Sequence, residues 1–123
     1  MARIPPRKGP ARPTASERAR KRRLLADLDR VGWFLRGTLL QVANRCGKPG
    51  CRCKADPPEL HGPYWQWTRK VEGKTVSVRL TDAQAELVRG WIGNAKTFDQ
   101  RLTELEELST RVIARILAAV AAR

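Results

Sequence analysis

Two kinds of hydrophobic periodicity, one typical of strands and one typical of helices, predict the elements of this 123-residue chain. Apolar and polar residues alternate in residues 37–45, 64–71 and 74–80, and a period of two is typical of half-buried strands. From residue 82 onward the apolar positions recur every three or four residues, which predicts a long helix. Thr81 and Gln84 have the spacing of a capping box, so we expect this helix to begin directly after Thr81.

The second and third runs predict a β-hairpin with a defined register. A two-residue turn at Glu72-Gly73 pairs Val71 with Lys74. One face then carries tryptophans and aliphatic residues, in the pairs Trp65–Leu80 and Trp67–Val78. The other face is expected to be entirely polar and cationic, in the pairs Gln66–Arg79, Thr68–Ser77 and Lys70–Thr75. A slip by one residue would mix the two sets, so the pattern favours this register. In the preceding run we expect Thr38, Leu40 and Val42 to point one way, opposite to Gln41 and Arg45.

The apolar positions of the last helix form a heptad seam. Its members are Val88, Trp91, Ala95, Phe98, Leu102, Leu105, Ser109, Val112, Ile116 and Ala119. A seam of this length extends beyond any core that a small sheet offers, so it requires a partner. We expect a homodimer through residues 96–123. The alternative is that Leu24, Leu25 and Leu28 of a preceding helix fold back on the seam.

All three cysteines and the only histidine lie within one stretch of sixteen residues. Three thiolates and one imidazole are a standard ligand set for structural zinc. The predicted ligands are Cys46, Cys51, Cys53 and His61. Asp56 or Glu59 could replace His61 as the fourth ligand. A redox-active or unligated thiol cluster is the other interpretation, because basic neighbours lower the pKa of a thiol and three cysteines cannot all pair within one chain.

Together these elements predict an α+β fold in four segments. Residues 1–15 are proline-rich and basic, which predicts a disordered arm. Residues 16–31 form a basic helix with Ser16 as its N-cap, and Gly32 ends it. Residues 36–95 hold a zinc-stapled, three-stranded antiparallel sheet and the start of the long helix. Residues 96–123 are the rest of that helix and the candidate dimerisation segment. Trp33 and Phe34 are expected in the core.

Three motifs resemble a family of small bacterial and archaeal proteins of unknown function. They are Gly37-Thr38-Leu39, the run CGKPGCRC from Cys46 to Cys53, and His61-Gly62-Pro63-Tyr64. The resemblance extends over roughly residues 36 to 108. Such proteins are often encoded beside transposases, so the resemblance implies a link to mobile DNA. It implies no catalytic residues.

The net charge of +13 lies entirely in residues 1–80, because residues 81–123 carry six basic and six acidic residues. A one-sided excess of cations favours a polyanionic partner, and nucleic acid is the first candidate. The candidate nucleic-acid-binding residues are Arg18, Arg20, Lys21, Arg22, Arg23, Arg45, Lys70, Lys74 and Arg79. An anionic membrane is disfavoured, because the chain lacks a long apolar run and an aromatic-faced basic helix. Free cysteines and the lack of a secretory signal predict a cytoplasmic location.

These observations predict a protein without enzymatic activity. A closed zinc site leaves no open position for substrate, and no general base or activated nucleophile is evident. Metal binding instead stabilises the fold of a sheet whose own hydrophobic core is small. The preferred function is a DNA-binding accessory of a mobile element, with a transposase as candidate partner, because a three-stranded sheet followed by a helix is similar to the arm-binding domains of tyrosine integrases. The alternatives are an RNA- or ribosome-associated module and a regulatory coiled-coil protein whose zinc loop binds another protein.

Overall fold

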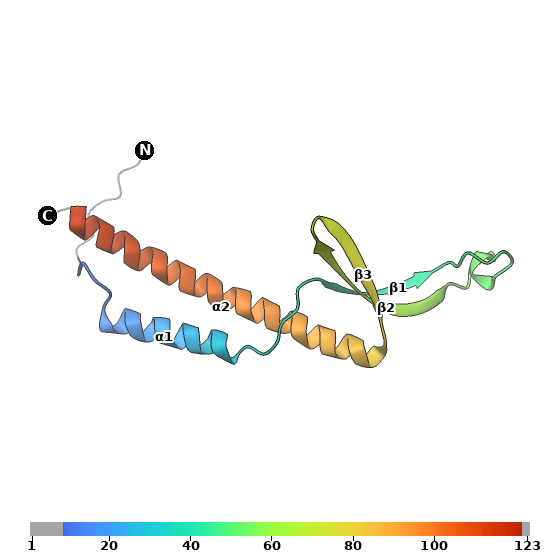
Figure 1. The fold of residues 1–123 in the computed structure, drawn as a ribbon, viewed down its shortest axis with the longest axis horizontal. Coiled ribbons are helices and arrows are strands. Elements are labelled where there is room, and N and C mark those ends of the chain that lie inside the picture. The colour runs from blue at the N-terminus through green and yellow to red at the C-terminus, as the bar shows by residue number, and fades with distance from the viewer. Residues whose placement is uncertain (1–8, 122–123) are drawn as a thin grey trace. The chain divides into compact units, whose positions relative to one another are not determined.

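The computed structural model describes residues 9–121 and confirms the α+β fold (Figure 1). Its elements are α1 (Ala15–Arg30), β1 (Thr38–Asn44), the short 3-10 helix η1 (Arg52–Lys54), β2 (His61–Val71), β3 (Lys74–Leu80) and α2 (Asp82–Ala121). Of the described residues, 9–32 and 96–121 form a helical unit, and 33–95 form a sheet unit. The predicted basic arm lies outside the described residues from position 1 to 8.

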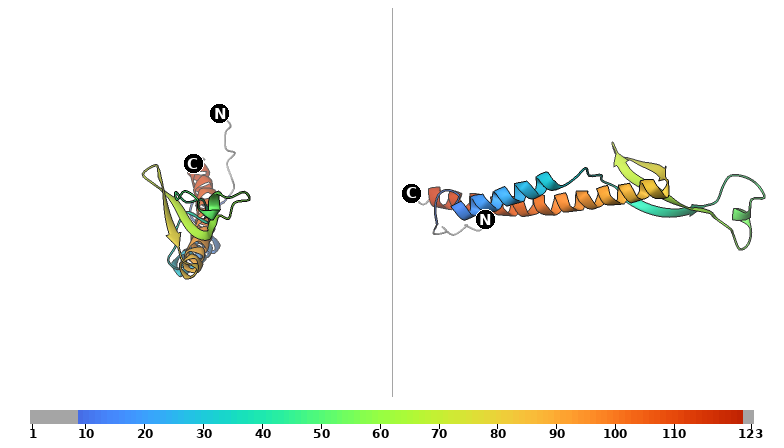
Figure 2. Two further views of the ribbon diagram at one scale, coloured as in Figure 1. Left: turned by 90° about the vertical axis from the view of Figure 1, so that its right-hand side faces the viewer. Right: turned by 90° about the horizontal axis from the view of Figure 1, so that it is seen from below.

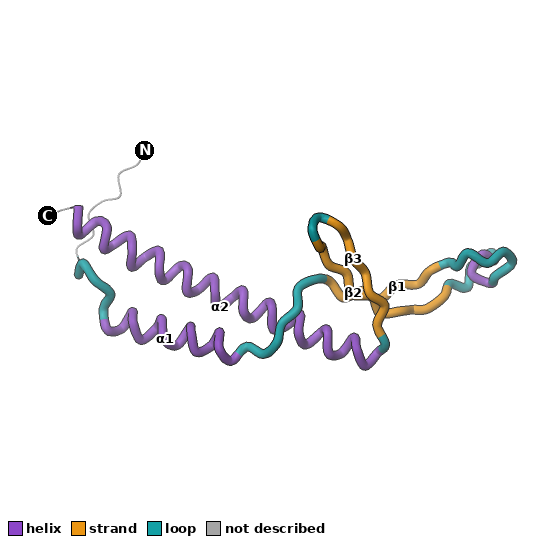
Figure 3. Tube along the Cα trace, in the orientation of Figure 1, coloured by secondary structure: helices purple, strands orange, loops and turns teal. Residues whose placement is uncertain are grey.

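The sheet unit is built on a three-stranded antiparallel sheet in the order β1-β2-β3 (Figure 3). The predicted hairpin register is confirmed, since Val71 pairs with Lys74 and the pairing continues without a slip along β3. Glu72 and Gly73 between the strands have φ angles of 49° and 78°. Two left-handed residues form a type I′ turn, whose twist matches that of the flanking strands.

Trp67 anchors the apolar face of the sheet. Its side chain is buried, and its neighbours on the adjacent strands are Leu39 and Val78. The indole Nε1 donates a hydrogen bond of 3.0 Å to the carbonyl oxygen of Arg36. Gly37 has a φ of +127°, and a Cβ at this position would lie 2.5 Å from the same indole nitrogen. Glycine is therefore required where the chain enters β1.

The opposite face of the sheet, called here the outer face, is less polar than the sequence predicts. β1 pairs Leu40 with Gln66 and Val42 with Tyr64, so its aliphatic side chains share the face of the predicted polar pairs. Leu40 is 47% exposed there. The prediction that Leu40 and Val42 point the same way agrees with this pairing, but they point away from the apolar face. The pattern of β1 is ambiguous because Leu39 and Leu40 are both apolar, and only the pairing with β2 separates them.

The first part of α2 belongs to the sheet unit and begins as predicted. The backbone N–H of Thr81 donates to Gln84 Oε1 at 2.9 Å, and the backbone N–H of Gln84 donates to Thr81 Oγ1 at 3.2 Å. This reciprocal pair is a capping box and satisfies two amides that the helix leaves without partners. Ala85 and Val88 in the next turns are buried.

The expectation that Trp33 and Phe34 fill the core is wrong. Trp33 is 88% exposed and Phe34 is 44% exposed. The segment is instead attached to α2 through its backbone. The N–H of Leu35 donates to the carbonyl of Trp91 at 3.1 Å, and Asn94 Nδ2 donates to the carbonyl of Trp33 at 2.8 Å. Polar contacts of the main chain therefore hold this segment, and the aromatic side chains are left outside.

In the helical unit, α1 begins two residues earlier than predicted. Thr14, not Ser16, is the N-cap, because its Oγ1 accepts a hydrogen bond of 3.1 Å from the backbone N–H of Glu17. The Glu17 carboxylate accepts one of 2.8 Å in return from the backbone N–H of Thr14. Ser16 has no glutamate or glutamine three residues later, so only Thr14 can complete a capping box.

α1 runs antiparallel to the later part of α2, as the views of Figures 1 and 2 agree. Their contact is an apolar cluster of Leu24, Leu108 and Val112, with Leu105 and Ile116 packed against it. The alternative of a helix folded back on the seam is thus what the structure contains, although Leu25 is exposed and does not join the cluster as predicted. Among the described residues, neither helix is apolar over a stretch long enough to cross a membrane.

One buried position of the seam differs from the prediction. Leu108 is buried, whereas Ser109 is only half-buried. Both positions satisfy the spacing of three and four between Leu105 and Val112, so the heptad pattern does not distinguish them. Because α1 covers this part of the seam, the argument that it would face water in a monomer no longer applies. The homodimer itself stays a prediction.

Arg115 holds the beginning of α1 to the end of α2. Its guanidinium donates to both carboxylate oxygens of Glu17, at 2.5 and 2.6 Å, in the bidentate geometry that makes such pairs strong. It also donates to the carbonyls of Pro10 and Arg12, at 3.1 and 3.0 Å. These bonds fix the backbone at residues 10 and 12, which the sequence placed in a disordered arm. Arg115 and Glu17 are only 15% and 21% exposed, so little water competes for the pair.

The Arg115–Glu17 pair predicts a specific loss of stability in acid. The hydrogen bond from Arg115, followed by that from the backbone of Thr14, lowers the pKa of Glu17 from its ordinary 4.5 to about 2. A carboxyl group with a lowered folded-state pKa stabilises the fold above its unfolded pKa, and this contribution is lost as pH falls from 4.5 through about 2. We therefore expect Glu17→Gln to destabilise the protein at pH 7, by an amount that shrinks toward zero near pH 2.

Urea unfolding followed by circular dichroism at 222 nm, at several pH values, measures this difference. Other groups that titrate in acid are common to both proteins and cancel in the comparison. The control is Glu107→Gln, which changes an exposed carboxylate on α2 of the same unit. A Glu17→Gln penalty that stays constant down to pH 2 would contradict the assignment.

Candidate metal centre

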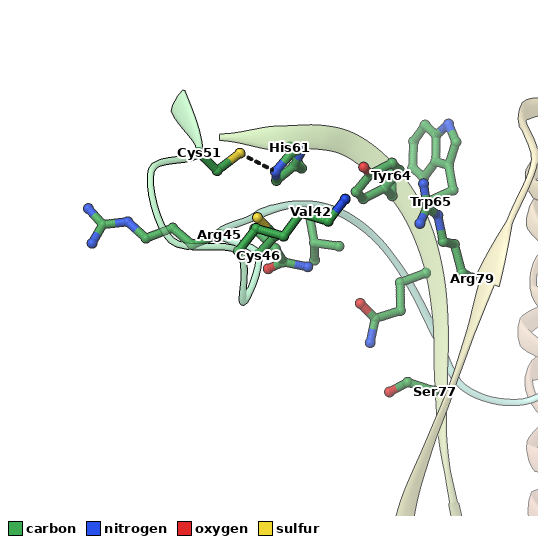
Figure 4. A pocket seen from close by; sticks show the side chains of 12 residues that line it. Val42, Arg45, Cys46, Cys51, His61, Tyr64, Trp65, Ser77 and Arg79 are labelled. Atoms are coloured by element: carbon green, nitrogen blue, oxygen red, sulfur yellow. Dashed lines mark hydrogen bonds between the residues drawn. The ribbon is translucent and has the colours of Figure 1, made fainter. Parts of the chain in front are cut away.

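The loop between β1 and β2 brings together the four residues with the chemistry of metal ligands. The ligand atoms of Cys46, Cys51, Cys53 and His61 all lie within 4.8 Å of one another. Each comes from a different local structure: Cys46 follows the end of β1, Cys51 precedes η1, Cys53 lies within η1, and His61 begins β2. Figure 4 shows Cys46, Cys51 and His61 side by side. The described residues therefore contain a cluster able to bind a metal ion.

The distances within the cluster approach those of a tetrahedral thiolate–imidazole site. Cys51 Sγ lies 3.2 Å from His61 Nε2, and Cys46 Sγ lies 3.6 Å from Cys53 Sγ. For zinc, bond lengths of about 2.3 Å to sulfur and about 2.0 Å to nitrogen give tetrahedral edges of about 3.8 and 3.5 Å. The limit of 4.8 Å that encloses all four ligand atoms is wider than these edges, so a bound metal would draw them closer together.

A tight turn of the backbone allows Cys51 and Cys53 to serve one centre although one residue separates them. The N–H of Lys54 donates to the carbonyl of Cys51 at 2.9 Å, which closes the 3-10 turn. The N–H of Cys46 donates to Cys53 Sγ at 3.2 Å. Cys53 is completely buried, so its sulfur faces the cluster and not solvent.

An irregularity in the sheet places His61 at the same centre. β1 and β2 pair Val42 with Tyr64 but Asn44 with His61, so one extra residue of β2 is left between the two pairs. A bulge of this kind re-aims the side chains beside it. Gly62 within the bulge has a φ of +105°, and a Cβ there would lie 2.9 Å from both the amide nitrogen of Tyr64 and the carbonyl oxygen of Val42. No residue with a side chain fits this position without a shift of the backbone.

The electrostatics of the cluster favour a cation at its centre. The backbone N–H of Lys48 lowers the pKa of the Cys46 thiol, and the neighbouring thiols and the Lys54 ammonium group act in the same direction. At Cys53 the backbone N–H of Cys46 also acts to lower the pKa, but burial and the two neighbouring thiols outweigh it and raise the pKa. Three thiolates side by side repel one another, and a divalent ion removes that repulsion.

The acidic alternatives for the fourth ligand lie outside the cluster. Asp56 and Glu59 are not among the four residues that converge. Glu59 instead forms an ion pair of 3.9 Å with Arg52 on the exposed side of the loop, and its backbone N–H donates to the carbonyl of Arg52 at 3.0 Å. His61 is thus the residue that the fold brings to this position.

A cleft of about 640 Å³ adjoins the metal centre. It runs from the cluster along the outer face of the sheet (Figure 4). The lining residues are Val42, Asn44, Arg45, Cys46, Lys48, Cys51, His61, Tyr64, Trp65, Gln66, Ser77 and Arg79. Among the described residues that line the cleft, three are cationic and none is acidic. Its chemistry therefore suits an anion.

Arginine side chains cover three aromatic rings of the sheet, those of Tyr64, Trp65 and Trp67. The guanidinium carbon of Arg79 lies 3.3 Å from the centre of the Tyr64 ring, within the cleft. On the apolar face, Arg69 lies over Trp67 at 4.3 Å. These are cation–π contacts, which hold a guanidinium in a fixed plane.

The candidate cations of the sheet unit do not all share one surface. Arg45 and Arg79 line the cleft. Lys70 lies on the outer face nearer the hairpin turn, where its Nζ donates to Thr75 Oγ1 at 2.8 Å. Lys74 pairs with Val71 and therefore belongs to the opposite, apolar face of the hairpin.

The candidate cations of α1 belong to the helical unit. The side chains concerned are those of Arg18, Arg20, Lys21, Arg22 and Arg23, all exposed. Arg20 and Arg23 line a groove that also contains the carboxylates of Asp27 and Glu104. Arg18 donates to the carbonyl of Pro13 at 2.8 Å. Part of this basic surface is therefore occupied by contacts within the unit.

Seven residues of the cleft were not predicted as binding residues from the sequence. They are Val42, Asn44, Lys48, Tyr64, Trp65, Gln66 and Ser77. The hairpin register already placed Gln66 and Ser77 on the outer face, and that register was available from the alternation of residues. Tyr64 lies two residues before Gln66 on β2, so the same alternation placed it on the outer face, whereas Lys48 could be found only from the path of the loop.

The fold and the site define a small α+β protein with a Cys3His cluster in a loop of its sheet. The chain belongs to the family described as a domain of unknown function (DUF6788), whose model matches residues 14–89. This match covers α1, the whole sheet and the loop with the four candidate ligands. The comparisons with curated proteins and with solved structures gave no match.

Proposed function

We propose that this protein is a nucleic-acid-binding module without enzymatic activity and that its ligand is duplex DNA. One structural zinc ion stabilises its sheet unit. The observation that carries the proposal is the cleft on the outer face, with three cations and no acidic residue among its described lining. The net charge of +13 acts in the same direction. Polyanion binding gains from the release of counterions, and it gains most where cations are concentrated on one surface.

Zinc is the metal that suits the cluster. Thiolates are soft ligands, and a set of three thiolates and one imidazole favours zinc over the hard ions Mg²⁺ and Ca²⁺. All four positions of a tetrahedron would be filled by Cys46, Cys51, Cys53 and His61. A filled site leaves no position for water or substrate on the metal, which supports a structural role and not a catalytic one.

Binding of DNA should depend steeply on salt, and two cations of the outer face should account for part of that dependence. We expect a plot of log affinity against log salt to have a slope of several units, and Lys70→Ala with Arg79→Ala to reduce it by about 1 to 2. Each lost phosphate contact releases about 0.9 fewer counterions. Fluorescence anisotropy with a labelled duplex at several salt concentrations measures both slopes.

The matched control is Lys74→Ala, which removes a lysine from the same hairpin but from its opposite face. It should leave the slope unchanged, and metal content should be equal in all variants. An unaltered slope in the Lys70→Ala, Arg79→Ala protein would exclude the outer face as the interface. Tighter binding to an RNA duplex of the same sequence would exclude DNA as the preferred ligand.

A further inference from the structure

We propose that the cleft beside the metal centre holds one unpaired nucleotide of the bound DNA, with its base against the Tyr64–Arg79 pair. The inference rests on the proposed function and makes its ligand specific. It separates two kinds of DNA that charge alone cannot distinguish: a fully paired duplex and a duplex with a base outside the stack.

The size of the cleft supports a ligand of this kind. Its volume of about 640 Å³ lies within the range of about 300–1,000 Å³ that is usual for sites of small organic ligands. A double helix can lie across the mouth of such a cleft but is too wide to enter it, whereas a single nucleotide is a ligand of this size. A paired base has both faces covered by its neighbours, so only an unpaired one can reach the floor of the cleft.

The Tyr64–Arg79 pair offers a flat surface for a base. Arg79 lies 3.3 Å from the centre of the Tyr64 ring, and the two side chains come from the neighbouring strands β2 and β3. Figure 4 shows Tyr64, Trp65 and Arg79 grouped on the side of His61 away from Cys51. Aromatic rings and guanidinium planes are the surfaces on which proteins stack unpaired bases.

Neutral polar groups also line the cleft and suit the edge of a base. Gln66 and Ser77 line the cleft from the outer face, and Asn44 lines it at the end of β1. An amide side chain presents both a donor and an acceptor, as a base edge does. Ser77 Oγ is 3.0 Å from Thr68 Oγ1, which orients this hydroxyl group.

The charges of the cleft suit the phosphate of the same nucleotide. Three thiolates around one divalent ion leave a net charge of −1 at the metal end. Arg45 and Lys48 lie at that end and Arg79 at the other, so the lining remains cationic with metal bound. The arrangement attracts a phosphate without presenting a carboxylate to repel it, and the base is then directed toward Tyr64.

The test compares three labelled duplexes of one sequence, using the full-length, metal-bound protein. One duplex is fully paired, one carries a single-nucleotide bulge, and one carries the same bulge without its base. Bulges bend DNA whether or not a base is present, so the abasic bulge controls for shape. We expect the bulge with a base to bind about fivefold more tightly, or more, than either of the others. Equal affinities for the two bulges would overturn the inference.

Arg79→Lys keeps the charge but removes the flat guanidinium, so it should abolish the preference for the base while leaving the salt slope intact. Arg69→Lys is the matched control, since Arg69 lies over Trp67 on the opposite face. It should retain the preference. Tyr64→Leu should also abolish it, with metal content confirming that the fold survives. A preference that persists in Arg79→Lys would contradict the assignment. Failure of all three duplexes to bind would refute the proposed function itself.

Discussion

Removal of the metal is expected to unfold the sheet unit and to leave the helical unit folded. The apparent binding free energy of structural zinc in small domains is about 10–16 kcal/mol, which is more than a unit of this size gains from its core. Few side chains of the sheet unit are buried, and Trp67, Ala85, Val88 and Ala95 supply most of its core besides Cys53. Binding energy at the cluster is therefore folding energy for the sheet.

Cys53→Ser provides the sharpest form of this experiment, because Cys53 is the one candidate ligand that is completely buried. We expect about one zinc per chain in the parent protein and almost none in the variant. The near-ultraviolet circular dichroism of Trp65 and Trp67 should disappear, while most of the helical signal at 222 nm remains. A chelator added to the parent protein should give the same result.

Lys54→Ser is the control, since Lys54 is the exposed neighbour of Cys53 in η1 and lies outside the cluster. It should keep both metal and tryptophan signal. If freshly reduced protein contains no metal and its sheet persists, the cluster is a set of free thiols, and the redox interpretation replaces the structural one.

The second large effect is expected in the helical unit, at Leu108. Its side chain is only 6% exposed and packs with Leu24 and Val112. Truncation of a buried leucine to alanine loses its transfer free energy and leaves a cavity, so Leu108→Ala should cost about 2–5 kcal/mol in unfolding free energy. Urea unfolding followed at 222 nm measures the loss.

Leu117→Ala makes the same chemical change on the same helix at a side chain that is 64% exposed. It should cost within about 0.5 kcal/mol. A loss as large as that of Leu108→Ala would mean that another chain covers Leu117. A dependence of that loss on protein concentration would identify the other chain as a second copy of this one and establish the predicted homodimer.

Features set by neighbouring residues could be predicted from the sequence. The hairpin register follows from strict alternation on both sides of Glu72-Gly73, because a slip would exchange the two faces. The capping box at Thr81 depends only on the residue three positions later. The convergence of the candidate ligands could be anticipated because all four occur in one short loop, which can bring its own residues together at little entropic cost.

Features that join distant parts of the chain could not be predicted. Leu108 and Ser109 fit the same periodicity, and only the approach of Leu24 decides between them. Leu39 and Leu40 are both apolar, and only the pairing of β1 with β2 sends one to each face. The contact of Arg79 with Tyr64 lies across the predicted hairpin, but the cleft also needs Val42 and Asn44, which only the pairing of β1 with β2 brings to its wall. Local patterns determine which elements form and which of their residues can be buried. Contacts between elements decide which of those residues are buried, because the free energy of burying each one depends on side chains far away in sequence.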